Sequence, residues 1–390
     1  SVRDRNGNIT THTYDERGNL LTVTSAAPFN YVTTFTYDAN DNITSIQYPD
    51  GGLTTYVYDT KGNVKEKRVK LDDSLTAVTA YTYDSYGRLL TVKDPENRTT
   101  TYEYGIGPDP IKAIDGEGGV TTFAYDNIGR MKSMTTADGT TTLEYNSLGQ
   151  IIKATNPANQ TVRNKYDAMG NLLKNILPES YNAQTDDGEG YEFVYNKLYQ
   201  QITVIDPLGH ITGYKYDQEG NMKKVIQPNQ YTPATNDGIG ISFEYDSDGR
   251  VIRSISPTGQ QARWIYDGNG NLIKYIDYNH YDEKTDSGQG MTYSYDTLNR
   301  VIEVRDPEGH ALFHYIYDEM GRVIKEIDAT GIASAGNDAD RIGTHNTYNL
   351  AGWLLEKREP LRTVQGETLY RVTKYEYDKN GLVTKKRLSP

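Results

Sequence analysis

The chain has no cysteine among its 390 residues, and several other features are scarce. Without cysteine, disulfides, thiolate zinc sites and a cysteine nucleophile are excluded. No apolar run approaches the roughly 20 residues that a membrane-spanning helix requires, and no signal peptide is visible. Basic residues are fewer than acidic ones, 41 against 53, which gives a net charge of −12. We therefore expect no nucleic-acid binding and no membrane insertion by this segment.

What is abundant is tyrosine, with 34 residues against 6 phenylalanines, together with 36 glycines. Aromatic and β-branched residues suit a pleated, half-buried surface, whereas Gly, Asn and Asp suit turns. Stretches rich in Ala, Leu, Glu and Lys, which would indicate helices, are scarce. The composition predicts an all-β protein.

A Tyr-Asp frame recurs sixteen times along the chain, which no catalytic motif requires. The repeat tyrosines are Tyr14, Tyr37, Tyr58, Tyr83, Tyr104, Tyr125, Tyr145, Tyr166, Tyr195, Tyr216, Tyr245, Tyr266, Tyr295, Tyr317, Tyr348 and Tyr377. The next residue is Asp in twelve frames, Asn in three and Gly105 in one. Four residues after the Tyr, Gly stands in twelve frames, and the exceptions are Asp41, Asn299, Tyr199 and Pro108.

Turn chemistry explains both positions. An Asp or Asn side chain accepts the backbone N–H two residues on, and Gly supplies a left-handed φ that a Cβ disfavours. Asp and Asn are the best substitutes there, so we expect fourteen frames to adopt this turn, with Tyr199 and Pro108 outside it. The predicted structural turn positions are Asp15, Gly18, Asp84, Gly87, Asp167, Gly170, Asp217, Gly220, Asp246, Gly249, Asp267, Gly270, Asp318 and Gly321. Each frame predicts a β-hairpin with a type I turn and a Gly bulge.

An aromatic residue stands two positions before the repeat Tyr in twelve frames. Residues i and i+2 share one face of a strand, so stacked hairpins would align these pairs into an aromatic ladder. The ladder is represented by Tyr56, Tyr58, Phe243, Tyr245, Trp264, Tyr266, Tyr315 and Tyr317. We favour packing of the sheet as its role, with sugar binding on the rings as the alternative.

Each unit ends in a second turn, such as "DPLGH" (206–210) or "SPTGQ" (256–260), which fits a type I turn with Pro second and Gly fourth. Turn, strand, turn and strand repeat every 21 residues or so, which predicts one antiparallel sheet growing as a meander. Sixteen hairpins supply about 32 strands, or roughly 150 Å of sheet. Twisted sheets of that size coil or close, so the predicted fold is a coiled, barrel-like or shell-like continuous sheet.

The spacing of the frames predicts a single repeat array over 1–390. Units over 1–165 are mostly about 21 residues long, and over 166–390 they alternate between about 21 and 29. The longer units hold Asp/Gly-rich stretches at 181–190, 231–240 and 281–290, and a looser fourth copy ends at Gly343. We expect these inserts to be edge loops that can be deleted without loss of the sheet. Calcium binding by Asp and backbone oxygens of these loops is an alternative to plain turn chemistry, although their second acidic position varies between Asp187, Asp237 and Ser287.

Other candidate sites are weak. His210 and His310 occupy equivalent turns 100 residues apart, but position 260 between them is Gln, so we interpret both as polar turn residues. Carboxylates are numerous and nothing singles out a catalytic pair. No nucleophile triad, phosphate loop or dinucleotide motif is present. We expect no enzyme activity, no cofactor, no metal and no catalytic residue.

The stretches "FEYDSDGRV" (243–251), "YTYDSYGRL" (81–89) and "YIYDEMGRV" (315–323) resemble the YD repeats of the Rhs family, whose consensus is Tyr-x-Tyr-Asp-x-x-Gly-Arg-Leu. The resemblance covers essentially the whole chain. It implies a spiralling sheet that closes into a hollow shell, as in bacterial Rhs proteins, insecticidal toxin complexes and teneurins. The family's Asp-Pro-x-Gly-Leu region with its aspartyl self-cleavage site is absent from these 390 residues, so we expect a piece of wall without its lid or its cargo.

The resemblance implies a scaffold: part of a shell wall around a C-terminal, toxin-like cargo of a larger secreted, bacterial or wall-associated protein. The expected partners are further repeats and the cargo of the same polypeptide, and the expected location is extracellular or at the cell surface. Both ends of the sequence lie inside a repeat, which predicts a segment of a longer polypeptide. The alternative function is a surface adhesin or carbohydrate-binding module without cargo.

Overall fold

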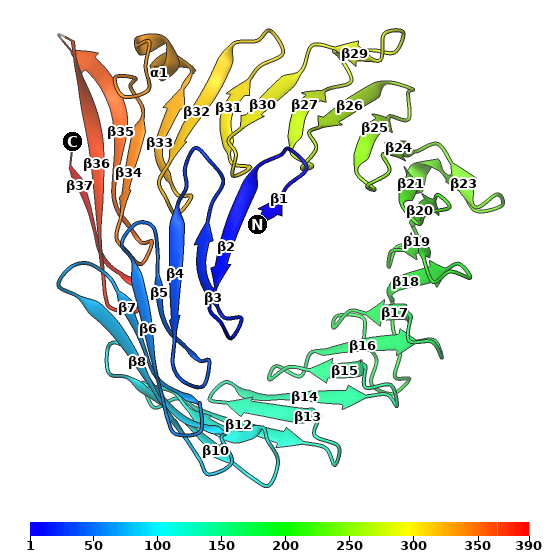
Figure 1. Cartoon of the computed structure of the whole chain (residues 1–390). Coiled ribbons are helices and arrows are strands. Elements are labelled where there is room, and N and C mark those ends of the chain that lie inside the picture. The colour runs from blue at the N-terminus through cyan, green and yellow to red at the C-terminus, as the bar shows by residue number, and fades with distance from the viewer. Residues whose placement is uncertain (365, 390) are drawn as a thin grey trace. The chain divides into compact units, whose positions relative to one another are not determined.

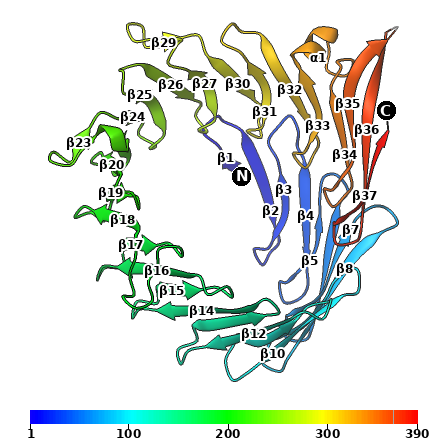
Figure 2. The same ribbon diagram turned by 180° about the vertical axis from the view of Figure 1, so that it is seen from behind.

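The structure is a computed structural model that describes residues 1–364 and 366–389. It is almost entirely antiparallel β-structure, and 33 strands form one hydrogen-bonded sheet. Successive strands pair in chain order, so that the sheet is a long meander of hairpins (Figure 1, and from behind in Figure 2). This confirms the fold class that the repeats predicted. No helix in the described part of the chain has the length and apolarity to cross a membrane.

The strands of the first half follow the repeat closely. They are β1 (Val2–Arg3), β2 (Ile9–Tyr14), β3 (Leu20–Thr24), β4 (Val32–Tyr37), β5 (Ile43–Gln47), β6 (Leu53–Tyr58), β7 (Val64–Lys70), β8 (Thr76–Tyr83), β9 (Leu89–Lys93), β10 (Thr99–Tyr104), β11 (Pro110–Ile114), β12 (Val120–Tyr125), β13 (Met131–Thr136), β14 (Gly139–Tyr145), β15 (Ile151–Thr155), β16 (Thr161–Tyr166) and β17 (Leu172–Ile176).

The second half adds short elements within the inserts. The elements are β18 (Gly190–Tyr195), β19 (Gln201–Ile205), β20 (Ile211–Tyr216), β21 (Met222–Ile226), η1 (Pro228–Gln230), β22 (Tyr231–Thr232), β23 (Asp237–Gly238), β24 (Ile241–Tyr245), β25 (Val251–Ile255), β26 (Gln261–Tyr266), β27 (Leu272–Ile276), β28 (Tyr281–Asp282), β29 (Ser287–Gly288), β30 (Met291–Tyr295), β31 (Val301–Arg305), β32 (Ala311–Tyr317), β33 (Val323–Asp328), α1 (Ala329–Ser334), β34 (Thr344–Tyr348), β35 (Leu354–Val364), β36 (Glu367–Tyr377) and β37 (Val383–Ser389).

Two compact units can be distinguished within the chain. Unit 1 comprises Ser1–Thr99, Trp264–Ile276 and Lys284–Pro390, and unit 2 comprises Thr100–Arg263 and Asp277–Glu283. In both units the strand that ends at the repeat Tyr pairs with the following strand, and the register shifts by one residue at that Tyr, as between Thr13 and Tyr14 in unit 1 and between Ala124 and Tyr125 in unit 2. The shift is the bulge that the turn type predicts.

Little of either unit is fully buried, because a single sheet has no second layer to cover it. The fully buried large side chains are four isoleucines, each with 0 % exposed surface: Ile176, Ile226, Ile276 and Ile327. Each is at or next to the end of a strand that leads into an insert. The largest fully buried side chains of the described residues therefore lie beside the inserts.

Candidate functional site

The turns that follow the repeat tyrosines form one edge of the sheet, which we call the Tyr-Asp edge. The seven predicted glycines at this edge all have positive φ, between 76° and 94°. Each predicted Asp accepts the backbone N–H of the residue four positions on, as Asn19 donates to Asp15 at 2.8 Å. Hydrogen bonds from Asn42, through its side chain and then its backbone N–H, lower the pKa of the Asp38 carboxyl.

Sequence reasoning missed the residue after the glycine, whose side chain closes the turn onto the Asp. Arg88 Nε donates to Asp84 Oδ2 at 2.7 Å, and Asn171 Nδ2 donates to Asp167 Oδ2 at 2.8 Å. The signal was present, because this position holds Arg, Asn or Gln in thirteen of the sixteen frames. Its side chain fixes the carboxylate that holds the turn.

Tyr199 corrects the expectation that two frames would fall outside this turn. Its φ is +61°, in the left-handed region, although Tyr has a Cβ. The Asn196 side chain accepts the N–H groups of Leu198 and Gln200 and holds the turn closed, and the exposed Tyr199 ring has room. Only the loop around Pro108 departs from the pattern among the sixteen frames that the structure describes.

The repeat tyrosines carry a second regular interaction through their hydroxyl groups. In thirteen frames the hydroxyl donates to the carbonyl of the first residue of the returning strand in the preceding hairpin, as Tyr58 does to Ile43 at 2.7 Å. Burial raises the pKa of Tyr195 and of Tyr295. This bond explains why the chain uses Tyr and rarely Phe, which ring packing alone does not.

The predicted aromatic ladder residues are all half-buried on the sheet. Ring contacts among the described residues are local, such as Trp264 with Tyr275 at 5.1 Å and Phe313 with Tyr315 at 6.2 Å between ring centroids. The interaction that recurs from hairpin to hairpin is the tyrosine hydroxyl bond.

The other edge consists of the turns that join one hairpin to the next, which we call return turns. In unit 1 the first five return turns (4–7, 26–30, 48–52, 71–75 and 94–97) lie against Tyr-Asp turns of the last hairpins. Arg322 Nη2 donates to Asp50 Oδ2 at 3.0 Å, and Leu350 N–H donates to the Leu71 carbonyl at 3.1 Å. Figures 1 and 2 both show the N-terminal strands beside the C-terminal ones.

We call this boundary between return turns and Tyr-Asp turns of unit 1 the seam. Its other three contacts also join one return turn to one Tyr-Asp turn. Asn6 Nδ2 donates to Asp267 Oδ2 at 2.8 Å, Asn380 Nδ2 donates to Asp94 Oδ2 at 2.8 Å, and the Arg300 guanidinium lies 4.9 Å from the centre of the Phe29 ring. Each contact joins a return turn to the Tyr-Asp turn twelve hairpins further along the chain. Two rows of turns therefore meet in constant register. Donors on the Tyr-Asp turns reach return-turn carboxylates at Asp50 and Asp94, whereas at the first contact the return turn donates to Asp267.

The inserts at alternate return turns differ from the edge loops that the sequence predicted. They fold back onto the sheet and bury the four isoleucines. A Cβ added to Gly238 would lie 1.9 Å from the Gln230 carbonyl oxygen, and one added to Gly190 would lie 2.1 Å from that of Asn175. These glycines are required by close packing, although the Asp/Gly composition suggested only turns.

The acidic residues proposed as calcium ligands face lysines. Asp187 lies 2.8 Å from Lys165 Nζ and 3.8 Å from Lys174 Nζ, and Asp237 lies 3.2 Å from Lys224 Nζ. The Lys165 ammonium, which donates a hydrogen bond to Asp187, lowers the pKa of that carboxyl to about 2. At the third position, Ser287 Oγ lies 2.8 Å from Thr285 Oγ1. These contacts fasten the first two inserts to the sheet.

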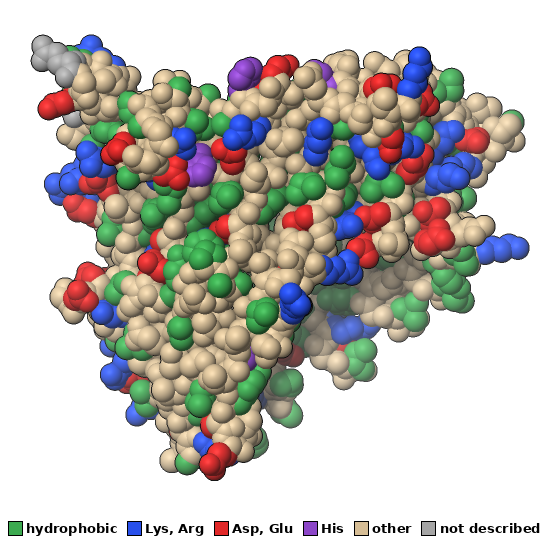
Figure 3. All heavy atoms as spheres, turned by 45° about the horizontal axis from the view of Figure 1, so that its top comes forward, with side chains coloured by type: hydrophobic (Ala, Val, Ile, Leu, Met, Phe, Trp, Pro, Cys, Tyr) green, Lys and Arg blue, Asp and Glu red, His purple; other side chains and the backbone are tan. Residues whose placement is uncertain are grey.

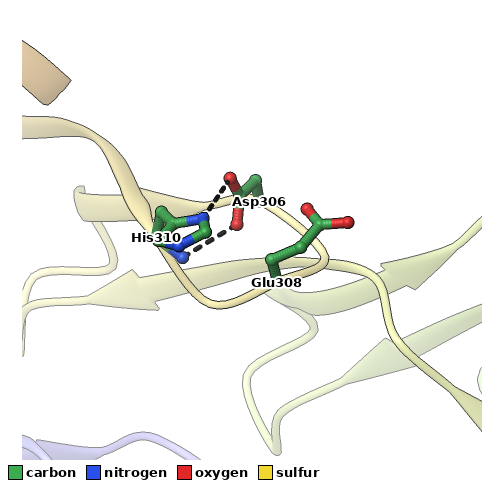
Figure 4. A group of neighbouring side chains, drawn as sticks. All are labelled: Asp306, Glu308 and His310. Atoms are coloured by element: carbon green, nitrogen blue, oxygen red, sulfur yellow. Dashed lines mark hydrogen bonds and ion pairs between the residues drawn. The ribbon is translucent and has the colours of Figure 1, made fainter.

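A second possible metal cluster contains Asp306, Glu308 and His310, whose ligand atoms lie within 4.8 Å of one another (Figure 4). His310 donates its backbone N–H to Asp306 Oδ1 at 2.8 Å, and its Nδ1 lies 3.1 Å from Oδ2. His210 makes the same pair of contacts with Asp206, in a turn where the middle residue is Leu208. Both histidines therefore close turns as Arg and Asn do elsewhere.

No patch of a single sign of charge is visible on the face of the described residues that Figure 3 presents. Lys and Arg side chains there are interspersed with Asp and Glu. The ion pairs described above account for this mixture, because basic residues close turns and hold inserts. The regular surfaces of the molecule are its two rows of turns.

Comparison with known proteins agrees with this geometry. Residues 53–175 match the family model described as Teneurin YD-shell, and residues 1–28, 27–53, 245–278 and 295–333 match the model described as RHS Repeat. No curated protein matches the chain by sequence. The repeats in these segments thus match RHS, or YD, repeats, as the sequence predicted.

Among solved structures the chain is similar to Tc toxin components. It shares 16 % identity and a TM-score of 0.69 with a chain of the Photorhabdus luminescens Tc holotoxin pore, covering 97 % of this chain and 21 % of that one. For a TcdB2–TccC3–TEV structure the values are 18 %, 0.57, 99 % and 22 %, and for TcdB2–TccC3–Cdc42 they are 14 %, 0.56, 94 % and 24 %. The chain spans less than a quarter of the length of these proteins.

Proposed function

We propose that this chain is a section of the wall of a hollow shell that encloses a C-terminal, toxin-like cargo of a larger secreted or cell-surface polypeptide. The role is structural, without catalysis. The partners are further repeats of the same polypeptide and the cargo itself.

The observation that carries the proposal is the seam in unit 1. A strip of hairpins whose first return turns meet its own Tyr-Asp turns twelve hairpins later returns on itself, and twelve hairpins of two strands span roughly 115 Å of sheet. The YD-shell match and the similarity to Tc toxin chains support the same arrangement.

Limited proteolysis tests the proposal. The polypeptide encoded by the complete reading frame is compared with its C-terminal region expressed alone, at equal protease concentration. We expect the C-terminal region to survive while the repeat sheet is folded and to be digested when alone. Equal digestion rates would contradict enclosure and favour the surface-adhesin alternative, which a glycan-array binding measurement on the 390-residue chain would then examine.

A further inference from the structure

A second row of Tyr-Asp turns, in unit 2, presents apolar side chains to solvent. Five successive hairpins carry Ile106, Ile128, Leu148, Met169 and Leu198 at or near the tip of the turn, with between 59 and 108 % of each side chain exposed. Single exposed apolar residues need no explanation. Five in consecutive turns at one edge indicate an interaction surface.

The seam in unit 1 contains a matched apolar side chain, Leu298, in a turn that contacts a return turn. Leu298 occupies the same turn position as Leu198, two residues after the Asx that starts the turn, and both backbone N–H groups donate to that Asx side chain. Leu198 is 74 % exposed, whereas Leu298 is half-buried in the turn whose Arg300 lies over the Phe29 ring. The difference follows from the presence of an opposing return turn.

Arg130 provides an independent match. Its Nε donates to Asp126 at 2.7 Å and its Nη1 to the Asn146 carbonyl at 3.0 Å. Arg322 makes the same two bonds within its own row of turns, to Asp318 and to the Asn349 carbonyl, and uses Nη2 to reach Asp50 across the seam. Within residues 1–364 and 366–389, no hydrogen bond from Arg130 Nη2 is described.

We propose that the Tyr-Asp edge over residues 104–200 is a docking surface for the return turns of a further run of RHS hairpins in the same polypeptide. The apolar tips pack against the opposing turns, and Arg130 receives a carboxylate at the position that Asp50 holds in the seam. In the seam of unit 1, each Tyr-Asp turn of the last five hairpins is contacted by one return turn.

The source of the occupant is argued from length. The similar Tc toxin chains are more than four times as long as the part that matches this one. The inference rests on the shell proposal, because a coiled wall of more than one layer needs such a contact. A second copy of this chain, or a cargo surface, is the competing occupant.

Cysteine labelling tests the docking surface, since the chain has no cysteine of its own. Leu198→Cys and the matched control Leu298→Cys are each labelled with a maleimide in the 390-residue chain and in the polypeptide of the complete reading frame, with the modified peptide identified by mass spectrometry. In the 390-residue chain we expect position 198 to react about tenfold faster than position 298. In the longer polypeptide we expect both to react slowly.

Three results would overturn the proposal. Equal rates at the two positions in the 390-residue chain would remove its premise. A fast rate at position 198 in the longer polypeptide would show the edge uncovered. A rate at position 198 that falls as the concentration of the 390-residue chain rises would assign the surface to a second copy.

Two arginine variants sharpen the assignment. Arg130→Gln should accelerate labelling at position 198 in the longer polypeptide and leave the rate in the 390-residue chain unchanged. Arg322→Gln should accelerate labelling at position 298 in both. An unchanged rate for Arg130→Gln in the longer polypeptide would exclude the carboxylate contact. Failure of the shell proposal would look different: the C-terminal region would be digested in the proteolysis experiment, while position 198 still reacted slowly in the longer polypeptide.

Discussion

The two edges of the sheet in unit 2 differ in that only the return edge carries inserts. At the Tyr-Asp edge every regular turn is closed by its own residues, with an Asx carboxylate or amide, a positive φ and a side chain that returns to the Asx. At the return edge, short turns alternate with inserts that fold onto the sheet and bury Ile176 and Ile226. The Tyr-Asp turns and the short return turns are determined by neighbours in sequence, as at Asp206 and His210, whereas the inserts depend on packing between residues further apart.

This difference indicates where substitutions should cost the most stability. Substitutions at the Tyr-Asp edge change a local turn, whose energy is about that of one or two hydrogen bonds. Substitutions under an insert open a packed core. The variants below break or sharpen this comparison, from the largest expected effect to the smallest.

Ile226→Ala should have the largest effect, because it leaves a cavity beneath the second insert. We expect the free energy of unfolding to fall by about 2–5 kcal/mol, measured by urea denaturation. The control is Leu208→Ala at a short return turn, where the side chain is 81 % exposed and the change should stay within about 0.5 kcal/mol. Equal unfolding midpoints for the two variants would show that the insert is an independent loop.

Gly129→Val should destabilise more than Gly129→Asn at the Tyr-Asp edge. Gly129 has φ +89°, and no heavy atom lies within 4 Å of an added Cβ, so the variants report backbone strain alone. A strained residue of this kind costs about 1–3 kcal/mol, and Asn tolerates positive φ best. Thermal unfolding of both variants measures the difference, and identical melting temperatures would refute the turn mechanism.

Tyr295→Phe removes the hydroxyl that donates to the Leu272 carbonyl at 2.8 Å. We expect a loss of about 1 kcal/mol in the free energy of unfolding. Tyr293→Phe, two residues earlier in the same strand, is the control, because no hydroxyl bond of Tyr293 is described in residues 1–364 or 366–389. If both variants unfold alike, the hydroxyl does not contribute and ring packing explains the repeat tyrosines.

Tyr199→Gly should stabilise the protein, against the usual trend for a large-to-small change. Its φ of +61° is strained for a residue with a Cβ, and relief of αL strain is worth about 1 kcal/mol. The matched control is Gly170→Tyr in the preceding hairpin, which should lose a similar amount. A destabilised Tyr199→Gly would mean that the exposed ring makes contacts that outweigh the strain.

Acid should loosen the first insert as the Asp187 carboxyl becomes protonated. The pKa of Asp187 is lowered from 3.8 to about 2, with the Lys165 hydrogen bond as the largest cause. A depressed folded pKa stabilises above the unfolded value, so this contribution is complete above pH 3.8 and is lost as pH falls toward 2. Amide exchange of residues 181–190 should quicken over that range, and Asp187→Asn should weaken the pH dependence, with Asp186 supplying the remainder.

The sequence predicts the Tyr-Asp edge because its rules are local. Asp15 and Gly18 are recognisable from turn chemistry, whereas Ile226 looks like any other apolar residue in a strand. Its burial depends on where the insert folds, which no local pattern specifies. The tyrosine hydroxyl bond was only partly predictable. The excess of Tyr over Phe is visible in the sequence, but the carbonyl that accepts the bond lies in a neighbouring hairpin. Tyr199 was misjudged because side-chain bonds to Asn196 override its own preference.

The tyrosine hydroxyl bond also has a direction in time. All thirteen described bonds run from a hairpin back to the one before it, where the acceptor carbonyl belongs to a strand that was synthesised earlier. During translation each new hairpin therefore meets a finished template as it leaves the ribosome, and chains fold from the N-terminal side as they emerge. A sheet made this way can form hairpin by hairpin, in the order in which the chain is synthesised.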